Sequence, residues 1–145
     1  MKKKQVGIWL DSREAFIIEV EGETGPPEII HIESEIEDQT HYHDDEPRRG
    51  VFANEQHILP EKKFQNRHAQ QVTQYVRELA EQLEDATQIF IFGPGVMKTH
   101  LAKHLESLPS FGGEVKAVQA EQHLTQNQLV AAVRQFFQPR RAAQF

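Results

Sequence analysis

Cysteine is absent from this 145-residue chain. Its absence excludes a disulfide framework, a thiolate metal site and a cysteine nucleophile, and it fits a reducing compartment. Long hydrophobic runs are absent too, because the first one, Val6 to Leu10, ends at Asp11. A run of that length is too short for a signal-peptide core or a membrane-spanning helix. We therefore expect a cytoplasmic protein with no membrane partner.

Positive charge is scarce and unevenly placed. The chain has 16 Lys and Arg against 22 Asp and Glu, which gives a formal net charge of −6. Asp11–Glu46 contains 13 acidic residues and one basic residue, whereas Pro47–Arg77 contains six basic and two acidic residues. An acidic protein is a poor candidate for coating duplex DNA, because neutralised phosphates supply non-specific affinity. The local basic segment can still contact RNA.

Three strands are predicted near the N-terminus. Gln5–Leu10, Glu14–Glu21 and Glu28–Glu33 are rich in β-branched and aromatic residues with partial alternation. A polar break at Asp11–Arg13, and the glycines and prolines within 22–27, favour turns between them. Two successive hairpins therefore predict an antiparallel three-strand meander.

Helical and strand patterns alternate in the second half of the chain. Apolar residues from Val72 to Leu83 recur with a helical period, which predicts an amphipathic helix from His68 onward. The other predicted elements are a strand over 87–92, a helix over 96–108, a strand over 115–120, and a helix that a capping box opens at Thr125 and Pro139 closes.

The order β-β-β, long loop, α-β-α-β-α predicts an α/β fold. The meander and the following crossovers give one mixed sheet flanked by helices, an order shared by ribonuclease H-like folds. We expect a single domain over 1–145. Residues 34–66 are expected to form a long flexible loop before the first helix, because they are polar, aperiodic and interrupted by Pro47, Gly50 and Pro60.

A basic group interleaved with Phe52 and Phe64 is the main candidate site. Arginine contacts phosphates, and aromatic rings stack on unpaired bases. The alternative is a charged, solvated loop and helix start, with Phe64 packed as a hydrophobic staple. The residues predicted to contact RNA are Arg48, Arg49, Lys62, Lys63, Arg67 and His68.

The turn Gly93-Pro94-Gly95, followed by Lys98, is a candidate anion-binding turn. Backbone N–H groups at a helix start favour anions, and a nearby cation adds to the attraction. The turn lacks the Gly-Lys-Ser/Thr ending of a P-loop, and a strand-to-helix turn needs glycines for conformational reasons alone. A purely structural role for Gly93, Gly95 and Lys98 is therefore the alternative.

Histidines and carboxylates cluster at His41, His43, Asp44 and Asp45. These side chains could bind a transition metal, but structural zinc takes four ligands from two separated pairs. A solvated polar loop is the alternative. We assign no metal site.

Asp11 raises the hypothesis of a two-metal nuclease, which needs converging carboxylates. Glu78 on the first long helix could face Asp11, and the loop acids Asp44 and Asp45 could add ligands. The next central strand ends in Gly93 rather than a carboxylate, so the set is incomplete. Asp11 as a hairpin turn residue is the favoured alternative, and we assign no catalytic residue and no cofactor.

Four segments together resemble one family. They are Val6–Asp11, the long connection, Lys63–His68 at the helix start, and Ile91–Gly95 followed by Lys98. Their order resembles the middle domain of the archaeal and eukaryotic peptide-chain release factor and Pelota group, with its short bacterial single-domain relatives. The resemblance covers nearly the whole chain and implies a ribonuclease H-like fold of the translational machinery.

Release factors of this family carry Gly-Gly-Gln in the long loop and use it to promote hydrolysis of peptidyl-tRNA. The corresponding region here offers Arg48-Arg49-Gly50, and the glycine pair at 112–113 is followed by Glu114. The resemblance therefore implies a contact with the ribosome or RNA without release activity.

We accordingly expect a non-catalytic, translation-associated accessory domain that contacts ribosome or RNA through its basic loop. A metal-dependent nuclease and a protein-interaction module stay open as alternatives. As a protein-interaction module, the chain would bind a basic partner through the acidic face from Glu19 to Glu46. A sheet edge or the helix bearing Phe136 and Phe137 would form a homo-oligomer.

Overall fold

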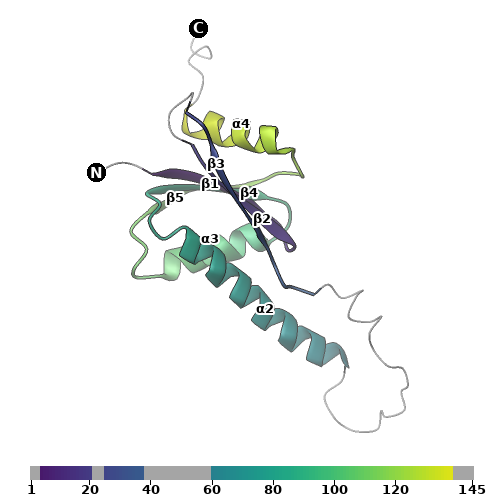
Figure 1. Ribbon diagram of the computed structural model, residues 1–145. Coiled ribbons are helices and arrows are strands. Elements are labelled where there is room, and N and C mark those ends of the chain that lie inside the picture. Colours follow the sequence, from purple (N-terminus) through teal and green to yellow (C-terminus); the bar gives the residue numbers. More distant parts are fainter. Residues whose placement is uncertain (1–3, 21–24, 38–59, 139–145) are drawn as a thin grey trace.

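The computed structural model describes residues 4–20, 25–37 and 60–138. Three strands are followed by alternating helices and strands, and the predicted α/β class is confirmed (Figure 1). Most predicted boundaries lie within one or two residues of the observed ones. The elements are β1 (Gln5–Leu10), β2 (Glu14–Glu19), β3 (Glu28–Glu33), α2 (Pro60–Gln82), β4 (Gln88–Gly93), α3 (Met97–Ser107), β5 (Glu114–Ala120) and α4 (Gln126–Phe137).

The five strands form one mixed sheet in the order β3-β2-β1-β4-β5. β2 is antiparallel to both β1 and β3, so the predicted meander is confirmed. β4 runs parallel to β1 and to β5, as crossover connections require. Ile8 sits at the centre, opposite Ile17 on one side and Ile91 on the other.

Helices cover both faces of the sheet (Figure 1). Because successive strand residues point to opposite faces, β1 contributes to two hydrophobic cores. Ile8 and Leu10 pack with α2 and α3 in a core that includes Leu79. Trp9 packs on the other face with Val133 of α4. Every one of these five side chains is almost completely buried.

Helix α2 begins at Pro60, eight residues before the predicted start at His68. The expected loop over 34–66 was therefore too long, because its last residues are helical. Proline is favoured in the first turn of a helix, where its missing N–H removes no hydrogen bond. Phe64, only 8% exposed, extends the buried stripe backwards, and its ring centroid lies 5.4 Å from that of His68. No helix in the described part of the chain is long and apolar enough to cross a membrane.

Helix α4 packs closely against β1 at Gly7. An added Cβ at Gly7 would overlap the side chain of Val133, which is fully buried. A β-branched side chain has little rotamer freedom, so the helix would have to move.

Replacing Gly7 with alanine is expected to destabilise the protein by about 1 to 3 kcal/mol, the usual cost of overpacking a tight core. Urea unfolding followed by circular dichroism measures the change. Gly112→Ala is the matched control, because an added Cβ there meets no atom within 4 Å. Equal stability of the two variants would contradict the close packing of α4 on β1.

Candidate functional site

The outer, exposed face of α2 bears the predicted RNA-contacting residues Lys62, Lys63 and Arg67. Lys62, Lys63 and Arg67 are exposed, and they lie on a helix rather than in a loop. No acidic residue occurs between Lys62 and Arg77. The exposed polar side chains that share this face at helical spacing are Lys62, Lys63, Asn66, Arg67, Gln70, Thr73, Gln74 and Arg77.

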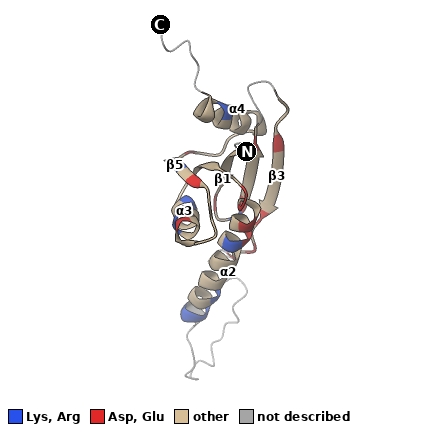
Figure 2. Cartoon of the chain, turned by 90° about the vertical axis from the view of Figure 1, so that its left-hand side faces the viewer, with Lys and Arg blue, Asp and Glu red and all other residues tan. Residues whose placement is uncertain are grey.

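The first half of α2 extends beyond the rest of the fold (Figure 1). Basic residues lie along this extension, whereas acidic residues lie nearer the sheet (Figure 2). At a rise of 1.5 Å per residue, the stretch from Lys62 to Arg77 is about 22 Å long. The face is long enough to contact several phosphates along one nucleic-acid strand.

An ion pair with Glu37 holds the side chain of Arg67. Its Nη1 lies 3.1 Å from Oε1 of Glu37, and the side chain keeps 45% of its surface exposed. The amide of Glu37 donates to Oε1 of Gln71 over 2.9 Å. The chain that follows β3 therefore lies against α2, and one carboxylate partly offsets the arginine's charge.

Of the other predicted RNA contacts, His68 alone belongs to the described residues. His68 is half-buried, and one helix step of about 100° turns it away from Arg67 toward Phe64. Arg48 and Arg49 lie outside the described residues. The structure thus brings together Lys62, Lys63 and Arg67, and it places His68 at a different surface.

That surface is a groove of about 950 Å³ between α2, the β1–β2 turn and the end of β3. Among the described residues that line it, four carboxylates outnumber one arginine, so this lining favours cations over phosphate. The lining residues are Asp11, Ser12, Arg13, Glu14, Glu33, Ser34, Ile36, Glu37, Phe64, His68 and His123.

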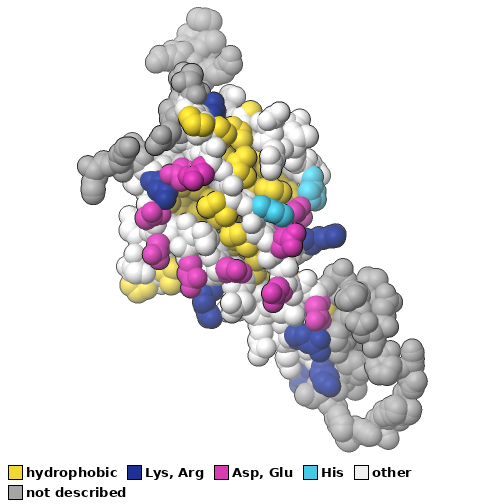
Figure 3. Space-filling model, viewed as in Figure 1, with side chains coloured by type: hydrophobic (Ala, Val, Ile, Leu, Met, Phe, Trp, Pro, Cys, Tyr) yellow, Lys and Arg dark blue, Asp and Glu magenta, His cyan; other side chains and the backbone are white. Residues whose placement is uncertain are grey.

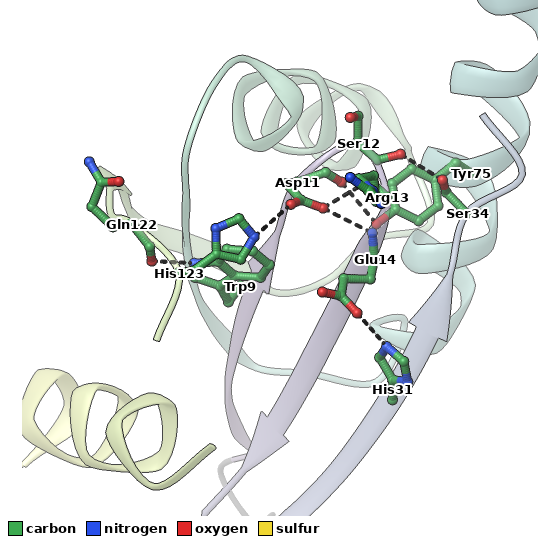
Figure 4. Close-up of polar contacts among 10 residues, drawn as sticks. All are labelled: Trp9, Asp11, Ser12, Arg13, Glu14, His31, Ser34, Tyr75, Gln122 and His123. Carbon is green, nitrogen blue, oxygen red and sulfur yellow. Dashed lines mark hydrogen bonds and ion pairs between the residues drawn. The ribbon is translucent and has the colours of Figure 1, made fainter. Parts of the chain in front are cut away.

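Asp11 joins the β1–β2 turn to the chain after β5 (Figure 4). Its Oδ1 accepts hydrogen bonds from the amides of Arg13 and Glu14, at 2.8 and 2.9 Å. Its Oδ2 lies 3.1 Å from Nε2 of His123. This is the geometry of a carboxylate that caps a turn, as the alternative interpretation of Asp11 predicts.

Trp9 completes this connection. Its Nε1 donates to the carbonyl oxygen of Gln122 over 3.0 Å, and its ring centroid lies 4.8 Å from that of His123. The sequence alone does not predict this contact. Asp11 and His123 are 112 positions apart, and no local pattern connects them.

The described residues contain no group of three His, Cys, Asp or Glu side chains that could hold a metal ion. Glu78 is exposed on α2, and Asp11 is engaged in the turn. The cluster of His41, His43, Asp44 and Asp45 lies outside the described residues. No observation in the described part of the chain favours the nuclease hypothesis.

The turn before α3 has a structural explanation. Gly93 has a φ of +145°, and an added Cβ would overlap the carbonyl oxygen of Leu10. Lys98 donates a hydrogen bond to the carbonyl oxygen of Gly95, which has a φ of +70°. Both features follow from the strand-to-helix turn. Anion binding at Gly93, Gly95 and Lys98 stays a prediction.

Tyr75 connects α2 to the β1–β2 turn. Its hydroxyl donates to the carbonyl oxygen of Asp11 over 3.1 Å. Burial, followed by the negative charges of Asp11, Glu14 and Glu78, raises the pKa of Tyr75. The neutral phenol is therefore favoured in the folded protein.

The raised pKa of Tyr75 predicts an alkaline loss of stability. The unfolded chain releases this proton from about pH 10, the ordinary value, whereas the folded protein retains it. The stabilising contribution is therefore complete below pH 10 and declines as pH rises toward the folded pKa. A Tyr42→Phe background leaves Tyr75 as the only tyrosine. Its phenolate absorbance should appear together with the loss of circular dichroism, and earlier appearance would contradict the burial.

The fold of this chain also occurs among solved structures. An archaeal translation termination factor, aRF1, superposes with a TM-score of 0.52 at 13% identity, covering 97% of this chain and 36% of that one. A structure described as an archaeal protein gives a TM-score of 0.43 at 13% identity, covering 93% of this chain and 34% of that one. The chain thus spans about a third of the length of each.

At 13% identity, the likeness to aRF1 shows the fold alone: this chain has a release-factor-like fold. No protein-family model matches the sequence. No curated protein sequence matches it either.

Proposed function

We propose that this chain is a translation-associated domain that contacts ribosomal RNA through the outer face of α2. The observation that carries the proposal is the exposed helical surface from Lys62 to Arg77, which bears cations and amides and no acid. The likeness of fold to a translation termination factor supports the link to translation. A ribonuclease H-like classification of the sheet is part of the same proposal.

The chemistry of the α2 face suits an RNA backbone. Lysine and arginine displace counterions from phosphates, which makes binding favourable and sensitive to salt. Neutral amides such as Gln70 and Gln74 can hydrogen-bond to phosphate and sugar oxygens without adding charge. Because no base-reading platform is needed for such contacts, we expect recognition of RNA shape rather than of sequence.

The proposed function is non-catalytic. The sequence contains no Gly-Gly-Gln, the tripeptide with which the resembling release factors promote peptidyl-tRNA hydrolysis. The buried Tyr75 and the turn-capping Asp11 are engaged in structural hydrogen bonds. The purified chain should therefore bind ribosomes without releasing peptide from a loaded ribosomal complex.

Replacing Lys62 and Lys63 together with alanine should weaken ribosome binding and flatten its salt dependence. The slope of log K against log salt should fall by about 0.7 to 0.9 for each phosphate that the variant no longer neutralises. Cosedimentation with ribosomes and isolated subunits over a salt series measures the slope.

The matched control replaces Lys103 and Lys116, two lysines on α3 and β5, with alanine. Both double variants change the net charge equally, so a non-specific charge effect would weaken both to the same extent. The proposal requires the α2 variant alone to lose binding. Equal slopes for the two variants, or no binding by the unchanged protein at low salt, would refute it.

A further inference from the structure

The two edges of the sheet differ in how open they are to another strand. β3 pairs with β2 in an unbroken register from Glu14 opposite Glu33 to Glu19 opposite Glu28. β5, at the other edge, has a register shift that leaves Lys116 without a partner on β4. Bulges and lysines on edge strands discourage further pairing. β3 has neither feature, so its edge keeps the regular geometry that a new strand needs.

The outward backbone groups of β3 follow from its pairing with β2. The amide of Ser34 donates to the carbonyl oxygen of Arg13, which fixes the alternation of the antiparallel ladder. Even-numbered residues of β3 therefore bond to β2. The N–H and C=O groups of Ile29, His31 and Glu33 point away from the sheet.

Apolar side chains line the same edge. Ile30 is 42% exposed, and Ile29 and Ile32 are half-buried. The ring of His31 stacks on Phe16 with a centroid distance of 4.6 Å. Figure 3 shows a band of hydrophobic side chains on this side of the molecule, bordered by acidic ones. An added strand would cover this band on both faces of the sheet.

Glutamates surround the edge. Glu28 and Glu33 are exposed at the two ends of β3, and Glu35 is exposed just beyond it. Glu14 and Glu19 stand opposite the two ends on β2. A second copy of the chain would bring an identical acidic set to the same place, and like charges across strands are unfavourable. A basic strand would instead pair with the glutamates.

We propose that β3 is a docking edge for an extended, basic segment of a protein partner, with Lys or Arg at positions i and i+5 and apolar residues between them. Glu28 and Glu33 are five positions apart and therefore lie on opposite faces of the sheet, as do residues i and i+5 of a strand. The main-chain hydrogen bonds supply affinity, and the two charge pairs supply selectivity. The site shares no residue with the basic face of α2.

The probe is the blocked peptide acetyl-Lys-Val-Thr-Ile-Val-Lys-amide, titrated into ¹⁵N-labelled protein. Binding should shift the amide resonances of Ile29, His31 and Glu33 and slow their hydrogen exchange. The same peptide with Glu in place of both Lys should bind about tenfold more weakly, because each charge pair becomes repulsive.

A charge reversal on the protein tests the selectivity. The double variant Glu28→Lys with Glu33→Lys should prefer the Glu-flanked peptide. Its matched control, Glu106→Lys with Glu114→Lys, changes two exposed glutamates on α3 and β5 and should keep the original preference. Loss of preference in both double variants would mean a general charge effect and would overturn the proposal.

A backbone variant tests the strand pairing separately. His31→Pro removes an outward N–H and no bond to β2, so the sheet should stay intact while peptide binding falls about tenfold. Intact folding is checked by circular dichroism, and Glu33→Pro is the second variant if His31→Pro unfolds. Unchanged peptide affinity in a folded proline variant would overturn the proposal.

Three further outcomes would also overturn it. The first is no binding by the unchanged protein at millimolar peptide. The second is a peptide footprint on α2 that disappears in the Lys62→Ala, Lys63→Ala variant. The third is self-association that increases with protein concentration in sedimentation and is absent in His31→Pro. This result would mean that a second copy of the chain occupies the β3 edge. Failure of ribosome binding leaves this proposal standing, because the two surfaces are tested by different variants.

Discussion

The alternation of side chains along β1 is the constraint on which the rest of the structure depends. Its even residues supply one hydrophobic core and its odd residues the other, so a slip of one residue would exchange the two. Two glycines allow close contacts with this strand. Because neither glycine has a Cβ, the side chain of Val133 fits against Gly7, and the carbonyl oxygen of Leu10 fits against Gly93. The turn at Asp11, with its contacts to α2 and to the chain after β5, follows from where β1 ends.

Most of the fold could be predicted from the sequence because its signals are local. β-branched and aromatic residues with partial alternation identified the first three strands, and the capping box at Thr125, which is present in the structure, located the start of α4. The start of α2 was placed too late because His68 interrupts the apolar stripe between Phe64 and Val72. His68 is half-buried with its ring tilted against that of Phe64, so it continues the inward side of the helix, but its polarity conceals this in the sequence.

The residues of the candidate site were named from the sequence, but their setting was not predicted. Lys62 and Lys63 were expected in a loop, whereas they share one face of α2 with Arg67 because the helix begins at Pro60. The groove beside them combines residues from the β1–β2 turn, the end of β3, α2 and the chain after β5, whose approach depends on the tertiary fold. The openness of β3 depends likewise on strand order, since an identical sequence within the sheet interior would offer no free backbone groups.

In the described part of the chain, the projection of α2 separates basic residues from the acidic residues near the sheet. The whole chain has a net charge of −6 and moves as an anion in an electric field, whereas this projecting part of α2 is basic. A dense surface of phosphates would rotate the protein before contact and hold its glutamates outward. If the α2 face binds RNA as proposed, the acidic residues near the sheet would stay accessible, and the same molecule would still present a surface for basic polypeptides.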